Sequence, residues 1–455
     1  MTKTKIVEIS RSRLSKLLNQ EQQRFVVRHP RSRELAEQAK QHLLAGVPMI
    51  WMTRWAGGFP VFVQTGEGAH FVDVDGNRYI DFCLGDTGAM TGHSPPAVTA
   101  AVTEQLRRGV TYMLPTQDAI WVGAELSKRF GLPFWQFALT ATDANRFALR
   151  IAREITERNR VLVFNYCYHG SVDEALISIS RGKAIPRRGN IGYAIQPGLT
   201  TKVIEFNDLR ALEMALAAKD IACVLAEPAM TNIGIIPPLQ GYHERLRELT
   251  REHGTLLIID ETHTISCGPG GYTAAYGLQP DILTIGKPIG GGIPTAAYGM
   301  TEDVAKRIAN VTDIDNADVG GIGGTLAANA LSMTAMRATL EHVLTAQNYE
   351  HMIKLADRFV AGVQAVLDEC SMPWTIKQLG CRVEYWYRPD PPRNGGEAAL
   401  AMDHDLDRFL HLYALNRGIL MTPFHNMALM SPATSEADVD AHTQVFREAL
   451  GVLVK

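Results

Sequence analysis

Two charged side chains follow directly after apolar runs of the sequence. Lys287 follows ILTIG and stands just before a group of glycines, and Asp260 closes the run TLLIID. A partly desolvated lysine has a lowered pKa, and its neutral amine can form a Schiff base with an aldehyde. A buried carboxylate needs a partner, which could be a protonated pyridine nitrogen or an ordinary arginine. Lys287 could equally be a surface lysine at a strand end.

Two further segments could hold a phosphate group. The stretch ALTATDANRFALRIAR (138–153) places Thr140, Ala141 and Thr142 at the start of a helix. A helix N-terminus offers free N–H groups and the positive end of its dipole, although the same residues could form a simple N-cap. The Gly-rich GGIGGTLAAN (320–329), which contains Thr325, also precedes a helix. It lacks the preceding strand and the ribose-binding acid of a dinucleotide fingerprint.

Other side chains follow further apolar runs. Tyr168 comes after VLVFNY, Glu227 after IACVLA, and Thr262 lies two residues beyond Asp260. Ligands of open parallel sheets bind outside the carboxyl ends of the strands, so these side chains would share one crevice. A Schiff-base lysine, a buried aspartate, a phosphate cup and a stacking aromatic ring together describe a pyridoxal 5′-phosphate (PLP) site. With no HExxH and no CxxC pair, we expect no metal site.

The elements that must position these residues alternate along the middle of the chain. Apolar runs separated by amphipathic helices indicate a parallel sheet covered on both faces. We predict strands over 161–166, 221–228, 255–261 and 282–287, and helices over 97–107, 118–129, 143–159, 209–218, 243–253 and 327–344. Three parts follow: an N-terminal helical segment and β-hairpin (1–90), a large PLP-binding domain (91–330) and a small C-terminal domain (331–455).

The first 45 residues read as a basic helix that breaks once near His29-Pro30, and residues 59–82 read as a hairpin. We interpret the basic helix as a solvated element that packs on a partner subunit; a small DNA-binding arm is the alternative. The formal net charge of −3 gives no global basic field for nucleic acid or anionic membranes. No run approaches the ~18 apolar residues of a membrane span. We expect a cytoplasmic enzyme with reduced cysteines.

The motifs resemble those of class III, fold-type I aminotransferases, near the branch of glutamate-1-semialdehyde aminomutase and β-amino-acid aminotransferases. The resemblance covers about residues 57–345 well and rests on FVDVDGNRYIDF with TGHSPPAV, NYCYHGSVDE, LAEPAMTN, LLIIDETHT and PDILTIGKPIGGGIPTAAYG. It implies an α/β fold: a large domain with a mostly parallel sheet flanked by helices, plus a smaller α+β C-terminal lobe.

The resemblance also assigns roles to single residues. It implies that Lys287 forms the internal aldimine with PLP, that Asp260 pairs with the pyridine nitrogen, and that Tyr168 stacks on the ring. Thr262 would lie behind the ring, and Glu227 belongs to the Glu-Pro signature of the cofactor site. Thr140, Ala141 and Thr142 match the phosphate loop. Thr325 would reach the phosphate from the neighbouring subunit, which implies a homodimer with shared active sites.

The sequence departs from the family at the substrate side. The phosphate loop has Ala141 in place of a glycine, and no Lys or Arg lies between Arg417 and Arg447 to hold a substrate carboxylate. Arg54 and His425 are therefore the candidate substrate-binding residues. Asp86 stands where the aminomutase carries an aromatic residue, which argues against a strict aminomutase.

We therefore predict a transaminase that moves an amino group between an amino acid or amine and a 2-oxo acid, with Lys287 carrying the proton. An aminomutase or racemase on the same cofactor is the alternative, because it would need no second substrate. A cofactor-sensing regulator with a basic N-terminal arm is a third possibility. It would need a complete DNA-binding domain before the hairpin, and the sequence shows none.

Overall fold

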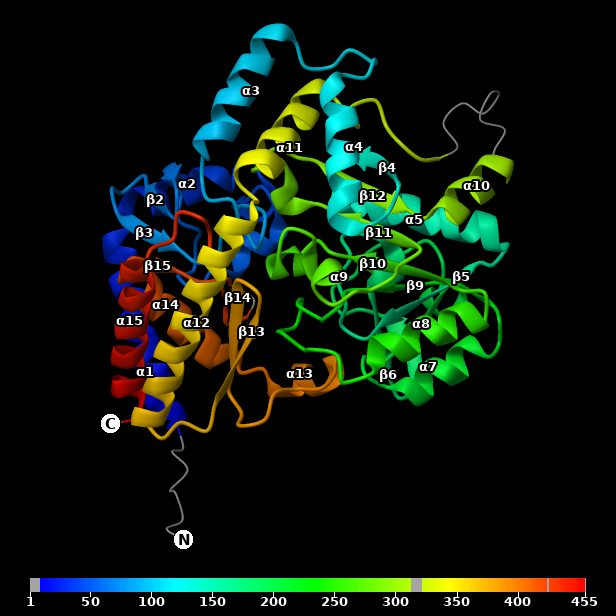
Figure 1. Ribbon diagram of the computed structural model, residues 1–455. Coiled ribbons are helices and arrows are strands. Elements are labelled where there is room, and N and C mark those ends of the chain that lie inside the picture. The colour runs from blue at the N-terminus through cyan, green and yellow to red at the C-terminus, as the bar shows by residue number, and fades with distance from the viewer. Residues whose placement is uncertain (1–8, 312–320, 424, 455) are drawn as a thin grey trace. The chain divides into compact units, whose positions relative to one another are not determined.

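The computed structural model describes residues 9–311, 321–423 and 425–454 (Figure 1). The chain forms two compact units. Unit 1 comprises Met1–Pro95, Glu350–Pro391 and Ala401–Lys455, and unit 2 comprises Pro96–Tyr349 and Pro392–Leu400. The N-terminal and C-terminal parts of the chain thus share one compact unit, with boundaries that differ from the three predicted parts.

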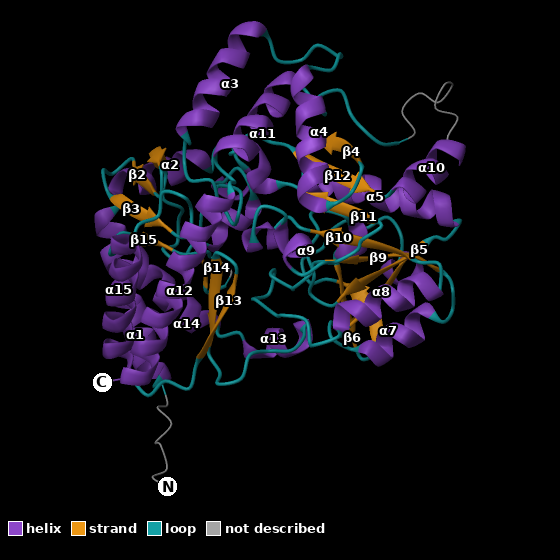
Figure 2. Ribbon diagram, in the orientation of Figure 1, coloured by secondary structure: helices purple, strands orange, loops and turns teal. Residues whose placement is uncertain are grey.

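Unit 2 is built on a seven-stranded sheet of order β4-β12-β11-β10-β9-β5-β8, which Figure 2 shows flanked by helices. The strands from β8 to β11 run parallel to one another, and β12 runs antiparallel to both of its neighbours. The sheet is therefore mostly parallel, as expected. Its strands are β4 (Phe134–Ala138), β5 (Arg160–Phe164), β8 (Thr201–Ile204), β9 (Ile221–Ala226), β10 (Leu256–Asp260), β11 (Ile282–Ile285) and β12 (Ala296–Met300).

Both faces of this sheet are covered. Every residue of β9, β10, β11 and β12 is buried. Because successive side chains of a strand point to opposite faces of the sheet, this burial requires helices on both faces. The continuous apolar runs of the sequence predicted this arrangement. The helices of unit 2 are α3 (Pro96–Arg108), α4 (Gln117–Phe130), α5 (Ala141–Thr156), α6 (Pro197–Thr200), α7 (Leu209–Leu216), α8 (Tyr242–Glu252), α9 (Gly271–Ala275), α10 (Glu302–Val311), α11 (Ala330–His342) and α13 (Gly395–Ala401).

The predicted helices and strands of unit 2 are present, with ends that differ by a few residues. Helix α5 ends at Thr156 rather than 159, because Glu157 adopts a left-handed conformation (φ 55°) that closes it. Strands β4, β8 and β12 were not predicted. Strand β12 reads AAYGM, and a Cβ on Gly299 would lie 2.6 Å from the Trp135 ring of β4. Packing of the Trp135 ring over Gly299, and not strand propensity, selects this strand.

Unit 1 contains two small sheets, ordered β1-β2-β3-β15 and β13-β14-β16, with a group of helices. The predicted hairpin forms β1 (Val63–Glu67), β2 (His70–Asp73) and β3 (Arg78–Asp81). The remaining elements are α1 (Arg11–Arg28), α2 (Pro30–Ala39), α12 (Ala346–Glu369, which begins in unit 2), β13 (Thr375–Leu379), β14 (Arg382–Trp386), α14 (His404–Leu415), β15 (Ile419–Leu420), β16 (Met427–Leu429) and α15 (Glu436–Val454). Two short strands, β6 (Ile177–Ser180) and β7 (Lys183–Pro186), form a separate ribbon in unit 2.

The basic N-terminal helix packs on its own chain, and its expected packing on a partner subunit stays a prediction. Helix α1 lies against α14. Its Glu21 carboxylate accepts a hydrogen bond of 2.7 Å from the Asn416 amide and forms an ion pair of 3.1 Å with Arg417. The Arg11 side chain of the same helix forms an ion pair with Asp403 of unit 1, so part of the basic excess is used inside that unit.

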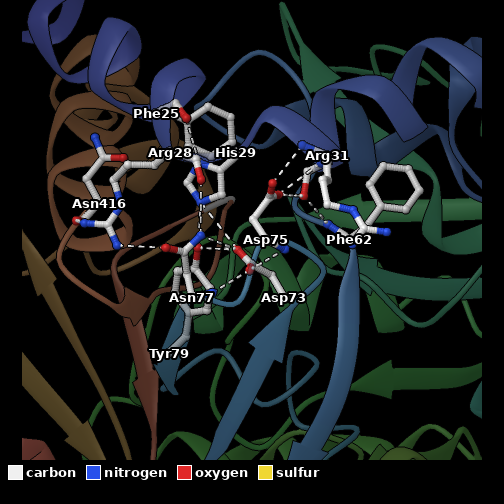
Figure 3. Close-up of polar contacts among 11 residues, drawn as sticks. Phe25, Arg28, His29, Arg31, Phe62, Asp73, Asp75, Asn77, Tyr79 and Asn416 are labelled. Atoms are coloured by element: carbon white, nitrogen blue, oxygen red, sulfur yellow. Dashed lines mark hydrogen bonds and ion pairs between the residues drawn. The ribbon is translucent and has the colours of Figure 1, made fainter.

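A buried network fixes the break between α1 and α2 at the predicted His29-Pro30 (Figure 3). The His29 ring donates from Nδ1 to the Phe25 carbonyl at 2.7 Å, and its Nε2 lies 2.6 Å from the Tyr79 hydroxyl. That hydroxyl lies 2.8 Å from Oδ2 of Asp73. The network ties the helices to the hairpin.

Within the described residues, no helix combines the length and the apolar character that crossing a membrane requires.

Candidate active site

Neighbouring strands β10 and β11 position the two charged residues that the sequence singled out. The strands are parallel, with Asp260 in register with Thr284, so both lead to the same edge of the sheet. Asp260 ends β10, and Lys287 begins a 3-10 turn just beyond β11 (Lys287–Gly290). The structure therefore brings these two predicted residues to one site.

Among the described residues, three donors hold the Asp260 carboxylate, and none of them is an arginine. Its Oδ2 accepts hydrogen bonds from His169 Nδ1 at 2.9 Å and from the Asn145 amide at 2.8 Å. Its Oδ1 accepts from the Thr262 backbone N–H at 3.0 Å. A carboxylate offers about four acceptor positions. Within the described residues, Oδ1 therefore keeps one position for a further donor.

Electrostatics keep this carboxylate ionised although it is buried. Burial works to raise the pKa of Asp260, but the hydrogen bond and charge of His169 hold it below its ordinary range. Burial likewise works to lower the pKa of His169, but Cys167 and Asp260 raise it to about 10. Asp260 is thus an ionised carboxylate and His169 a protonated imidazolium. The negative charge of Asp260 favours a protonated donor at its remaining acceptor position.

Helix α5 supplies the residue that orients the pair. Asn145 is fully buried and also donates to the His169 carbonyl at 3.1 Å. The Thr284 hydroxyl donates to the Asn145 Oδ1 atom at 2.6 Å, which fixes the amide so that its nitrogen faces Asp260.

Lys287 lies close to a histidine. Its Nζ is 2.7 Å from Nε2 of His263, a buried side chain three residues beyond Asp260. The Lys287 backbone is left-handed (φ 52°), an uncommon conformation for a side chain of this size. At Gly286 an added Cβ would lie 3.0 Å from Ala141, so the strand end closely approaches the start of α5. The lysine is thereby held at the predicted phosphate segment.

The start of α5 forms a cradle. Thr140 is the N-cap and accepts a hydrogen bond from the Asp143 backbone at 3.2 Å, and the Thr142 hydroxyl accepts from the Ser171 backbone at 3.1 Å. A Cβ on Gly170 would lie 2.1 Å from the Thr142 hydroxyl, so only glycine fits beside it. The helix dipole and these hydroxyls suit a phosphate group.

The other predicted cofactor residues of unit 2 lie in different surroundings. The hydroxyl of buried Thr262 makes no hydrogen bond to any residue that the structure describes, and Tyr168 exposes 38% of its surface. Buried Glu227 accepts a hydrogen bond from the Thr231 hydroxyl. Thr325, which directly follows Gly323 and Gly324 of the Gly-rich segment, is exposed. An orphaned hydroxyl, an exposed ring and an open carboxylate position fit an aromatic, phosphorylated ligand such as PLP.

The two predicted substrate residues, Arg54 and His425, belong to unit 1. Arg54 is exposed at the end of a 3-10 helix (Ile50–Arg54). His425 is buried with Nδ1 2.7 Å from Glu384. Burial works to lower the pKa of His425, but Glu384 and then Asp86 raise it above its ordinary value. Asp86 itself forms an ion pair of 3.4 Å with fully buried Arg382, so its charge is compensated in place.

Sequence reasoning did not assign roles to three residues of this site: His169, Asn145 and His263. His169 stood inside the Tyr-His-Gly motif, and His263 inside LLIIDETHT, so their presence was visible although their roles were not. Asn145 gave no signal beyond its place on the helix that follows the phosphate segment.

The comparisons with known proteins agree with this geometry. The family model for class-III aminotransferases matches residues 51–450. A glutamate-1-semialdehyde 2,1-aminomutase from Brevibacillus brevis is 32% identical over 92% of this chain and 98% of its own length.

Three solved structures are similar over nearly the whole chain. A glutamate-1-semialdehyde-aminomutase from Pseudomonas aeruginosa PAO1 is 50% identical, covers 98% of this chain and 99% of its own, and has a TM-score of 0.96. The same values hold for its lysine-to-alanine variant in complex with PMP. An omega-transaminase from Sphaerobacter thermophilus is 28% identical, covers 94% and 99%, and has a TM-score of 0.86.

Proposed function

The chain belongs to the class-III aminotransferase family, and from this premise we propose that it uses PLP to move an amino group within or between small amino-acid substrates. The observation that carries the proposal is the Asp260 carboxylate, held ionised by His169 with one acceptor position open. It lies at the sheet edge from which Lys287 projects and near the start of α5.

The residues of this chain would divide the work as follows. When bound, PLP supplies an aldehyde and an electron-accepting ring. The α5 N-terminus with Thr140 and Thr142 would hold its phosphate, and Thr262 and Tyr168 would contact the ring. Asp260 would keep a proton on the ring nitrogen, which is electrostatic stabilisation fixed in advance. The Lys287 Nζ atom would bind covalently and then carry a proton to and from the substrate carbon.

Two reactions are compatible with these parts, and the comparisons favour the one that the sequence analysis held as the alternative. The aminomutases among the relatives move an amino group between two carbons of one molecule, as their name says. We therefore place an aminomutase first. Transamination to a 2-oxo acid, the first expectation from the sequence, stays as the second candidate. It is supported by Asp86, which stands in place of an aromatic residue, and by the similarity to an omega-transaminase.

One assay separates the two reactions. The loaded enzyme is given glutamate-1-semialdehyde alone, and in parallel a panel of amino acids and amines with pyruvate or 2-oxoglutarate. Repeated turnover of the semialdehyde without a 2-oxo acid supports the aminomutase. Turnover that requires a 2-oxo acid supports the transaminase, and no turnover in either arm would contradict the proposal.

We also propose that the enzyme acts as a homodimer in which Thr325 contacts the phosphate of the partner's site. Support comes from exposed apolar side chains before α4, where Tyr112, Met113 and Leu114 are 43%, 76% and 74% exposed. Such a cluster marks an interaction surface. Light scattering should give the mass of two chains, and Thr325→Ala should weaken PLP binding; a monomer with unchanged PLP affinity in the variant would contradict this.

Arg54 and His425 remain our candidates for the substrate carboxylate. If either holds it, Arg54→Ala or His425→Ala should raise KM for acidic substrates while PLP affinity stays the same. A variant whose KM does not change removes that residue from the proposal.

A further inference from the structure

The site contains one polar contact that the reaction described above does not use. Nζ of Lys287 lies 2.7 Å from Nε2 of His263. The sheet register creates this pairing: Asp260 and Thr284 are register partners on β10 and β11, and His263 and Lys287 each follow three residues later. The two nitrogens are thus brought together by the main scaffold of unit 2.

When Lys287 is protonated, this contact has only one arrangement. A lysine ammonium can only donate, and an imidazole that accepts at Nε2 must be neutral and carry its proton on Nδ1. His263 is 7% exposed, and burial favours the neutral ring. An ammonium facing a neutral imidazole nitrogen can pass it a proton. The lysine then becomes a neutral amine, and the histidine becomes an imidazolium.

That transfer is what Lys287 needs before it can act. Only a neutral amine has the electron pair to attack an aldehyde carbon. We propose that His263 is a positioning residue for Lys287 that accepts the Nζ proton and so generates the nucleophilic amine. In this step one N–H bond of Lys287 breaks, one N–H bond forms at His263 Nε2, and the freed electron pair stays on Nζ. The inference rests on the proposed function, because it assumes that Lys287 binds PLP covalently.

The surroundings suit a residue that holds a proton briefly. The two acids that precede His263 in the sequence are already engaged: Asp260 with His169, and Glu261 with the Thr264 hydroxyl and the backbone of Tyr272. Burial raises the pKa of Glu261, although the hydrogen bonds from Thr264, Thr273 and Tyr272 work to lower it. His263 therefore faces the lysine, and the two acids before it in the sequence have partners of their own.

The test measures loading of the full-length apoenzyme with PLP, and not turnover. Non-covalent binding is followed by tryptophan fluorescence, and formation of the bond to lysine by visible absorbance in a stopped-flow instrument. His263→Ala removes the imidazole. His263→Gln keeps an acceptor of similar size but cannot take a proton. His243→Gln is the matched control, because this partly buried ring contacts only the Pro228 carbonyl, at 2.7 Å, among the hydrogen bonds of the described residues.

We expect the bond-forming step to slow by about 10²-fold or more in both His263 variants, the usual size of a general acid–base contribution. The non-covalent step and the His243→Gln control should match the wild type, and added imidazole should speed His263→Ala. A wild-type rate of bond formation in either His263 variant would overturn the inference. In His263→Gln, such a rate would show that position 263 needs only a side chain of this size and not a proton acceptor. If wild-type protein itself forms no bond to lysine, the proposed function fails instead.

Discussion

Each unit of this protein buries a histidine beside an aspartate, and the two pairs differ in a way that separates structure from chemistry. In unit 1, His29 meets Asp73 through the Tyr79 hydroxyl, with the ring and carboxylate 3.5 Å apart (Figure 3). In unit 2, His169 donates directly to Asp260 at 2.9 Å. The residue types are the same, so their partners must set the difference.

The acceptor positions of the two carboxylates are used differently. Asp73 faces the backbone N–H groups of Asp75 and Asn77, the Asn77 amide and the Tyr79 hydroxyl, which fill about four positions. Asp260 has three donors among the described residues. Because all acceptor positions of Asp73 are occupied, its carboxylate only stabilises the turn. Asp260 keeps one acceptor position free of the described donors, so its carboxylate can also bind a ligand.

The histidines titrate in opposite directions. Burial dominates at His29 and lowers its pKa, while the contacts of His169 overcome burial and raise its pKa to about 10. His29 thus serves as a neutral link between α2 and the hairpin. His169 serves as a fixed positive charge that keeps Asp260 ionised. The four predictions below would sharpen or break this contrast.

The largest effect is expected from Asp260→Asn. An amide in place of the carboxylate cannot hold a proton on the ring nitrogen, so kcat should fall by about 10²–10³-fold, as for loss of a central electrostatic group. The matched variant Asp73→Asn should keep its kcat per folded molecule. Steady-state kinetics at saturating PLP measures both, and equal kcat losses in the two variants would remove the distinction.

Stability should show the reverse order. Asp73→Ala leaves several buried donors without an acceptor, and the free energy of unfolding should fall by about 3 kcal/mol. Urea unfolding followed by circular dichroism measures this value. The contrast fails if Asp73→Ala is as stable as the wild type.

The third prediction concerns alkaline pH. The folded-state pKa of His169 is raised from 6.5 to about 10, so its contribution to stability is complete below pH 6.5 and is lost as the pH rises through about 10. His169→Gln should lack this alkaline loss. Thermal melts from pH 7 to 10 would show it as a flatter profile in the variant, and parallel profiles would contradict the raised pKa.

The smallest effect is expected at acid pH. The folded-state pKa of His29 lies below 6.5, so the unfolded chain takes up a proton that the folded chain refuses. Stability is complete above pH 6.5 and falls as the pH drops towards the lowered value. His29→Gln should reduce this slope in melts between pH 7 and 5; a steeper slope would show that His29 is protonated in the fold.

Local patterns predicted much of this site. Lys287 and Asp260 each end an apolar run, and the threonines of 138–153 stand at a helix start, so strand ends and a helix dipole sufficed to find them. The family resemblance supplied their roles. The seven-stranded sheet was likewise predicted where its strands are continuous and apolar.

Long-range pairing could not be predicted. Asn145 and Asp260 lie 115 residues apart, and His169 and Asp260 lie 91 apart, so only the folded sheet shows that they meet. The sequence allowed either an arginine or a ring nitrogen as the partner of Asp260, and the fold placed a histidine there. Strand β12 was not predicted for a related reason. Its Gly299 is needed because the Trp135 ring of β4 packs directly over it, and this contact is seen only in the fold.

The central claim is that Lys287 binds PLP through its side-chain nitrogen. Reduction of the PLP-loaded protein with borohydride, followed by proteolysis and peptide mass spectrometry, tests it directly. We predict a pyridoxyl group on the peptide that contains Lys287 and none in Lys287→Ala. A protein that stays colourless with PLP, or an adduct found only on another lysine, would contradict the account.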